Sequence, residues 1–182
     1  MPAVFNDYMD AVRASNDSAL KYYPGSPAIA AHLLREDDRL RLVEMHSADV
    51  NILEDNLGHD PRVKVISGDG FEQIRALLPP SARRGLILID PPYEVKEDYQ
   101  HVLEGVQEGL KRFATGTFLI WYPLLSTTAS QKFAGQLQKL HPSWLNAQLK
   151  VSVKPYGHGM YGSGMFVVNP PWVLREQLQE GL

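Results

Sequence analysis

The 182-residue sequence contains no cysteine and has almost no excess of charge of either sign. Without cysteine the chain cannot form a disulfide, a thiolate metal site or a cysteine nucleophile. Its 18 basic and 21 acidic residues give a formal net charge of −3. That balance argues against a protein that coats nucleic acid by bulk charge, although a local basic patch is still allowed.

Long apolar stretches are also lacking. The longest runs, such as Gly85 to Ile89 and Thr117 to Trp121, are far shorter than the roughly 20 residues that a membrane-spanning helix needs. The chain does not open with a basic segment followed by an apolar one, as a secretory signal would. We therefore expect a cytoplasmic protein that does not contact a membrane. An apolar share of 44% is sufficient for one folded domain, which we expect to span residues 1–182.

The apolar pattern alternates between the strand and the helix period, which predicts an α/β fold with a mostly parallel sheet. Expected strands are Leu40 to Glu44, Val63 to Ile66, Gly85 to Ile89, Thr117 to Tyr122, Leu149 to Val153 and Met165 to Val168. Expected helices are Asp7 to Ala14, Pro27 to Arg35, Ser47 to Leu57, Phe71 to Leu78, Tyr99 to Phe113, Gln131 to Leu140 and Trp172 to Leu178. No long helix separates the last two strands, so we expect an antiparallel hairpin at one edge, joined by Gly157 to Gly164. The strand Gly85 to Ile89 is apolar on both faces, which predicts a buried central strand.

Acidic residues follow three successive predicted strands: Glu44, Asp69 and Asp90. In an open α/β sheet, ligands bind at the carboxyl ends of the strands. We therefore expect the three carboxylates along one rim, where they can accept hydrogen bonds from ribose hydroxyls or an exocyclic amine. The alternative for each is a helix N-cap, a position that Asp favours.

The sharpest signal is Asp90-Pro91-Pro92-Tyr93, directly after a predicted strand. The adenine N6 amine is a poor nucleophile, because its lone pair is delocalised into the ring. The Asp90 carboxylate and the Pro91 carbonyl could accept both N–H groups, which favours a tetrahedral nitrogen whose lone pair points at a methyl donor. The prolines restrict the backbone and hold that carbonyl in place. Tyr93 offers a ring face for a flipped-out base. The alternative is a strand-to-helix turn with Asp as cap.

A second stretch, Asn169-Pro170-Pro171-Trp172, satisfies the same loose pattern. We prefer Asp90, because it belongs to the acidic series, whereas an N-cap role before the closing helix explains Asn169. The six histidines show no zinc-like spacing with carboxylates, so we expect no metal site.

These residues carry a resemblance to a known family. Asp-Pro-Pro-Tyr is the catalytic motif of amino-group adenine methyltransferases. The stretch Arg84 to Tyr93, with Tyr22 to Pro27 upstream and Asn169 to Trp172 downstream, resembles the RlmJ family of 23S ribosomal RNA adenine-N6 methyltransferases. The likeness runs from about Lys21 to Trp172.

The resemblance implies a Rossmann-like class I methyltransferase fold, S-adenosylmethionine as cofactor and 23S rRNA, free or protein-poor, as the partner. It implies that Glu44 holds the cofactor ribose and that Asp69 and Gly70 contact its adenine. Ser26 and Asp90 would line the cofactor pocket, and Asp90 would also be the proton acceptor.

The chain departs from the family pattern at its start. Nothing in Met1 to Leu20 matches the family's strand that ends in Asp or its Gly-rich loop. We therefore expect a partial domain that lacks the first strand, binds S-adenosylmethionine weakly by itself and could dimerise through exposed strand edges, while the parent is a monomer. The alternatives are an inactive fragment that binds RNA or a protein, and a DNA adenine-N6 methyltransferase.

Overall fold

The computed structural model describes residues 5–16, 19–152 and 159–181. The chain divides into two compact units, residues 1–73 with 179–182, and residues 74–178. Each unit is described by itself. The expectation of one domain over residues 1–182 stays a prediction.

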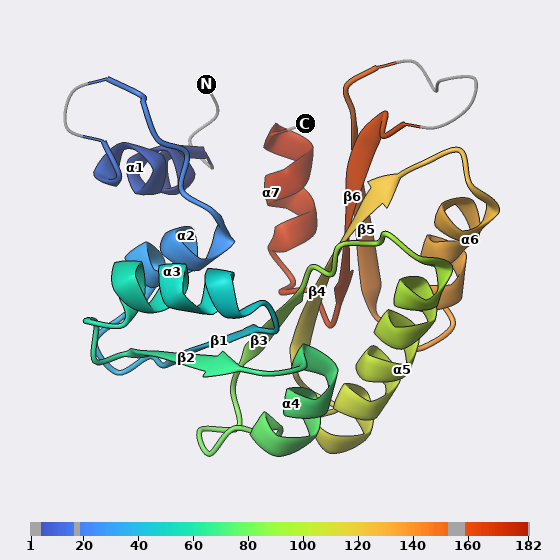
Figure 1. Cartoon of the computed structure of the whole chain (residues 1–182). Coiled ribbons are helices and arrows are strands. Elements are labelled where there is room, and N and C mark those ends of the chain that lie inside the picture. Colours follow the sequence, from blue (N-terminus) through green and yellow to red (C-terminus); the bar gives the residue numbers. More distant parts are fainter. Residues whose placement is uncertain (1–4, 17–18, 153–158, 182) are drawn as a thin grey trace. The chain divides into compact units, whose positions relative to one another are not determined.

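The first unit contains a two-stranded parallel sheet and the helices around it (Figure 1). Its elements are α1 (Asn6–Ala14), α2 (Ser26–Leu33), β1 (Leu40–Glu44), α3 (Ser47–Leu57), β2 (Val63–Ser67) and the first half of α4 (Gly70–Leu77). The register pairs Leu40 with Val63 and Glu44 with Ser67. Both strands therefore end at the same edge, where Gly68 N donates to the Glu44 carbonyl oxygen at 2.9 Å.

The second unit is built on a four-stranded sheet in the order β3-β4-β6-β5. Its elements are β3 (Leu86–Ile89), α5 (Lys96–Arg112), β4 (Thr117–Leu124), α6 (Thr128–Leu137), β5 (Trp144–Lys150), β6 (Gly162–Val168) and most of α7 (Leu174–Gly181). The β3–β4 pair is parallel, whereas β6 pairs antiparallel with both β4 and β5. The antiparallel hairpin predicted for one edge is therefore confirmed.

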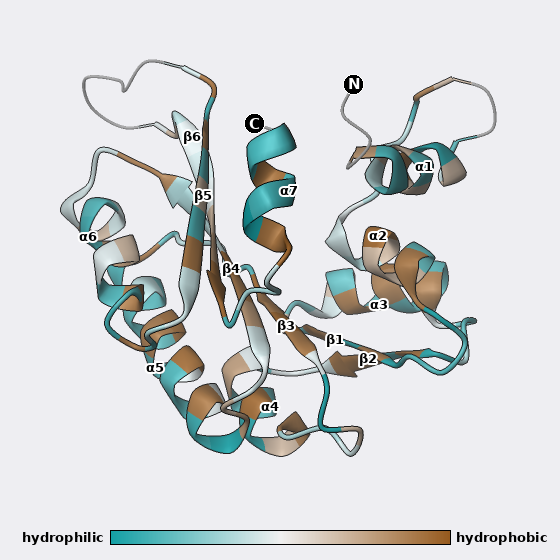
Figure 2. Cartoon of the chain, turned by 180° about the vertical axis from the view of Figure 1, so that it is seen from behind, coloured by the Kyte–Doolittle hydropathy of each residue, from teal (hydrophilic) through white to brown (hydrophobic). Residues whose placement is uncertain are grey.

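The core of this unit lies between the sheet and the helices α5 and α6. Phe118 and Ile120 of β4 and Phe166 of β6 are fully buried. Along α5, Val102, Gly105, Val106 and Gly109 are buried at spacings of three and four residues, which is the period of one helix face. A Cβ atom on Gly109 would lie 2.6 Å from the Phe118 ring, so only glycine allows this close approach. In Figure 2 the apolar colouring follows the strands, while much of α7 is hydrophilic.

The structure corrects the expectation for the strand after Arg84. Leu86 is 62% and Leu88 42% exposed, so β3 is not a buried central strand. Within its unit β3 pairs with β4 alone, which makes it an edge strand. Ile89, on the other face, is buried as expected.

The last two strands also differ from the expectation. β5 begins five residues before the predicted Leu149, and β6 begins at Gly162, inside the predicted connection. Gly162 and Gly164 are buried in β6. Only glycine fits at these two positions, because a Cβ atom would overlap Leu149 at Gly162 and the Tyr122 ring at Gly164. The predicted strand end at Val153, and the start of the connection at Gly157, lie outside the described residues.

Candidate active site

The Asp90-Pro91-Pro92-Tyr93 loop follows the carboxyl end of β3 and leads into α5. Tyr93 connects this loop to the sheet. The Tyr93 side chain is only 6% exposed, and its hydroxyl donates to the Trp121 carbonyl oxygen of β4 at 2.7 Å. Its φ angle of 53° lies in the left-handed region, which non-glycine residues adopt only at a cost. The hydrogen bond and the ring packing stabilise this conformation.

The Tyr93 ring belongs to an aromatic cluster that sequence reasoning missed. Its centroid lies 4.8 Å from that of Tyr99, 5.9 Å from Phe133 and 6.3 Å from Trp121. Aromatic rings at such separations add stabilisation beyond the area that they bury. No local pattern could reveal the cluster, because its members come from α5, α6 and β4.

This burial differs from the predicted role of Tyr93. An open ring face for a base requires solvent access, and the ring is enclosed by its aromatic neighbours. Burial also raises the pKa of the Tyr93 hydroxyl well above its ordinary value, so the group stays protonated and remains a donor. In this structure Tyr93 therefore positions the loop instead of presenting an open face.

Asp90 itself is exposed at the end of β3. Within the described residues its carboxylate makes no hydrogen bond or ion pair, so its oxygens are available as acceptors. Although Asp90 is exposed as a residue, neighbouring protein atoms displace part of the solvent around its carboxyl group. This desolvation raises the pKa of the Asp90 carboxyl above its ordinary value, because it penalises the charged form. Because the Asp90 carboxylate has no hydrogen-bond donor among the described residues, it can bind a ligand that donates hydrogen bonds to it.

The second Pro-Pro stretch has a structural role. The Asn169 side-chain amide donates to the Ala114 and Gly116 carbonyl oxygens at 2.7 and 3.0 Å. Its backbone has a φ angle of 51°, which Asn tolerates better than most residues. Asn169 is therefore not the N-cap that the sequence suggested, since α7 begins only at Leu174. Instead it closes the loop between α5 and β4.

Asn169→Ala should therefore destabilise the chain by about 1–3 kcal/mol, because two carbonyl oxygens lose their donor. Asn169→Gly should lose the same bonds but tolerate the positive φ better. Urea unfolding of both variants measures the difference. If neither changes stability, the amide does not hold this loop, and Asn169 would again be a candidate for chemistry.

All the predicted cofactor residues except Asp90 lie in the first unit. Glu44 ends β1, and its Oε1 accepts from His46 N at 2.8 Å, while the other carboxylate oxygen makes no hydrogen bond within the described residues. Asp69 follows β2, and its Oδ1 accepts from Phe71 N at 2.7 Å. A Cβ on Gly70 would meet no atom within 4 Å, so open space adjoins this turn. Ser26 is exposed at the first position of α2.

The structure thus brings Glu44 and the Asp69 turn together, through the paired ends of β1 and β2. The N-cap alternative holds in part for Asp69, whose carboxylate bonds the first turn of α4. Asp90 belongs to the second unit. The expectation that all three carboxylates line one rim stays a prediction.

The described residues offer neither a metal centre nor a membrane-spanning helix. Among the described residues, no three His, Cys, Asp or Glu side chains are grouped so that they could hold a metal ion. None of the helices in the described part of the chain combines the length and apolar character needed to cross a membrane.

The chain has a Rossmann-like α/β fold, which it shares with solved structures of other enzymes. Precorrin-6y C5,15-methyltransferase from Geobacter metallireducens GS-15 matches with a TM-score of 0.50 at 14% identity, over 79% of this chain and 74% of that chain. Spermidine synthase from Thermotoga maritima also matches with a TM-score of 0.50, at 16% identity, over 78% of this chain and 50% of that chain.

Within this class, the chain belongs to the family described as ribosomal RNA large subunit methyltransferase D, RlmJ, whose model matches residues 1–182. Ribosomal RNA large subunit methyltransferase J of Escherichia coli (strain K12) is 45% identical over 187 aligned residues, and that of Haemophilus influenzae (strain ATCC 51907 / DSM 11121 / KW20 / Rd) is 47% identical over 165. The matches cover 100% and 88% of this chain, but only 66% and 58% of those proteins.

A crystal structure of a Legionella pneumophila str. Philadelphia 1 protein gives a TM-score of 0.93 at 33% identity. The match covers 100% of this chain and 68% of that chain.

Proposed function

We propose that this chain carries the catalytic motif of an enzyme that uses S-adenosylmethionine to methylate N6 of an adenine in 23S ribosomal RNA. The observation that carries the proposal is the loop after β3, in which Tyr93 is fixed to Trp121 while Asp90 is exposed and has no hydrogen-bond or ion-pair partner among the described residues. Membership of the RlmJ family supports the substrate class.

Asp90 is proposed to accept a hydrogen bond from the target N6 amine. An acceptor on the amine favours a tetrahedral nitrogen and aligns its lone pair for attack on a methyl group. Pro91 and Pro92 limit the motion of the loop, and the buried Tyr93 fixes where the loop ends. These residues together would hold the amine in one orientation, which is the main contribution that positioning makes to such a transfer.

S-adenosylmethionine, when bound, supplies the methyl group. The residues proposed to hold it are Glu44, Asp69, Gly70 and Ser26. Their chemistry fits an adenosine: each carboxylate keeps an oxygen that can accept from a ribose hydroxyl or an exocyclic amine, and the open space at Gly70 admits a ring.

The proposed partner is 23S rRNA that is free or poor in protein, and the proposed location is the cytoplasm. We propose that the enzyme acts as a monomer and that the 182-residue chain could pair through the edges of β1 and β3, each of which pairs with only one strand among the described residues.

The test compares the 182-residue chain with a completed chain, in which it is joined to the segments of the Escherichia coli relative that lie outside the match. Both are incubated with S-adenosylmethionine labelled in its methyl group and with deproteinised 23S rRNA. We expect label at adenine N6 in the completed chain, and weak cofactor binding by the 182 residues alone in calorimetry. Equal labelling of duplex DNA would favour a DNA enzyme, and no labelling of either substrate would contradict the proposal.

A further inference from the structure

We propose that the RNA strand flanking the target adenine binds a surface on both sides of α6, in the second unit. This surface, called the α6 face below, consists of two cavities. The inference rests on the proposed function and adds where the substrate backbone lies.

The first cavity has a volume of about 240 Å³ and lies where β4, β5, the start of α6 and Tyr161, just before β6, meet. Its polar lining comprises two amides, one cation, two phenols and one hydroxyl: Gln131, Gln148, Lys150, Tyr122, Tyr161 and Ser130. A cavity of this size can admit a nucleobase, and amide side chains can both donate to and accept from base edges.

The second cavity, of about 180 Å³, lies between α5 and α6. Its polar lining repeats the same chemistry, with two cations and two amides: Lys96, Lys132, Gln100 and Gln136. Consecutive residues of α6, Gln131 and Lys132, line different cavities, so α6 forms the wall between them. A strand that occupies both cavities must cross this helix.

Charge favours a polyanion at the α6 face. The two linings contain three lysines and neither Asp nor Glu, although the whole chain has a net charge of −3. Lys96 and Lys132 form no ion pair within the described residues. By contrast, Lys111 and Arg112 at the far end of α5 both pair with Glu108.

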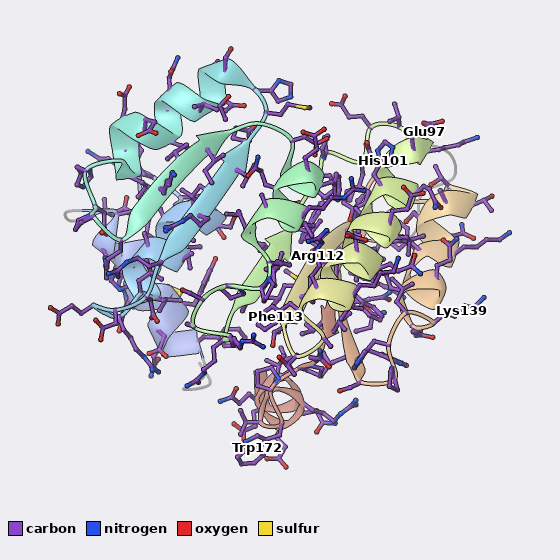
Figure 3. All side chains as sticks on the ribbon, turned by 90° about the horizontal axis from the view of Figure 1, so that it is seen from below. Glu97, His101, Arg112, Phe113, Lys139 and Trp172 are labelled. Carbon is purple, nitrogen blue, oxygen red and sulfur yellow. The ribbon has the colours of Figure 1, made fainter. Side chains whose placement is uncertain are left out.

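One carboxylate of α5 adjoins the second cavity, because Glu104 Oε1 accepts from Gln100 Nε2 at 2.8 Å, although Glu104 is not itself a lining residue. Lys96, Gln100 and Leu103 recur at spacings of four and three residues and line one helix face. Glu97 and His101 lie one position further along, about 100° round the helix. Figure 3 shows this pair at the beginning of α5, with Arg112 at the opposite end.

Aromatic contacts join the α6 face to the proposed catalytic loop. Tyr99 lines the second cavity, and its ring centroid lies 4.8 Å from that of Tyr93. Tyr122 lines the first cavity and contacts Phe133 at 5.6 Å, which in turn contacts Tyr93 at 5.9 Å. Both cavities therefore adjoin the cluster that fixes the loop. Lys96 follows Asp90 by only six residues, so RNA held there stays near the motif.

The test measures the binding of a fluorescent single-stranded RNA of mixed sequence to the full 182-residue chain over a range of salt concentrations. Each phosphate contact on single strands contributes about 0.7 to the slope of log affinity against log salt. The double substitution Lys96→Ala with Lys132→Ala should lower that slope by about 1.4 and weaken binding by about tenfold. Lys139→Ala is the matched control, because Lys139 follows the opposite end of α6 and projects outward in Figure 3.

Equal losses in the control and the double variant, unchanged binding in the double variant, or no RNA binding by the unsubstituted chain would each overturn the proposal. Asp90→Ala separates the two hypotheses, since it should lower methyl transfer by the completed chain by about 10²–10⁴-fold and leave the salt slope intact. Lysine-dependent binding without any methylation would contradict the proposed function alone. Methylation with a lysine-independent slope would contradict the α6 face alone.

Discussion

Asp90→Ala should lower methyl transfer by the completed chain by about 10²–10⁴-fold, the range typical for loss of a positioned acid–base group. The carboxylate is exposed and has no partner among the described residues, so its removal should not unfold the protein. Transfer of labelled methyl groups to 23S rRNA, together with a urea unfolding curve, measures both effects. Unchanged turnover in a folded variant would contradict the assignment.

The control for this substitution is Glu94→Gln, which alters another exposed carboxylate of the same loop region. It should leave turnover within about twofold, because surface changes outside a site have small effects. Because desolvation raises the pKa of Asp90, methyl transfer should begin to fall, as pH is lowered, at a higher pH than an ordinary Asp would give. Asp90→Asn should remove that acidic limb from the pH profile.

Tyr93→Ala should destabilise the chain by about 3–5 kcal/mol, the cost of removing a buried aromatic side chain. It empties the centre of a cluster that includes Tyr99, Trp121 and Phe133. Tyr93→Phe keeps the ring and should cost only about 1 kcal/mol of unfolding free energy, through the lost bond to Trp121. It should nevertheless slow methyl transfer, because the end of the loop is no longer tied to β4. Urea unfolding and kcat measure the two effects separately.

Tyr99→Phe is the matched control. The Tyr99 hydroxyl is also buried, yet it has no hydrogen-bond partner in the described chain. The neighbouring Ser130 hydroxyl already donates to the Pro123 carbonyl oxygen and accepts from Leu125 N. Removing the Tyr99 hydroxyl should therefore be neutral or slightly stabilising. Equal losses in Tyr93→Phe and Tyr99→Phe would show that the bond to Trp121 does not hold the loop.

The sequence by itself determined the order of the elements and the position of the motif. The strand Leu40–Glu44 and the helix Ser47–Leu57 have the bounds that were expected. Such features are local: a helix or strand period and its flanking turn residues lie within one short window. The same holds for the Asp-Pro-Pro-Tyr loop, whose place after a strand follows from an apolar run that ends in Asp90 and two prolines.

Only the tertiary structure decided what those residues contact. The Tyr93 hydroxyl donates a hydrogen bond to Trp121, which lies 28 residues away in the sequence. The Asn169 amide donates one to Ala114, which lies 55 residues away. The tertiary structure also showed that β3 is exposed on one face. The sequence could not show this, because an edge strand and a central strand can have the same apolar composition. Contacts between distant segments depend on how strands pair and helices pack, and no short window of sequence records that.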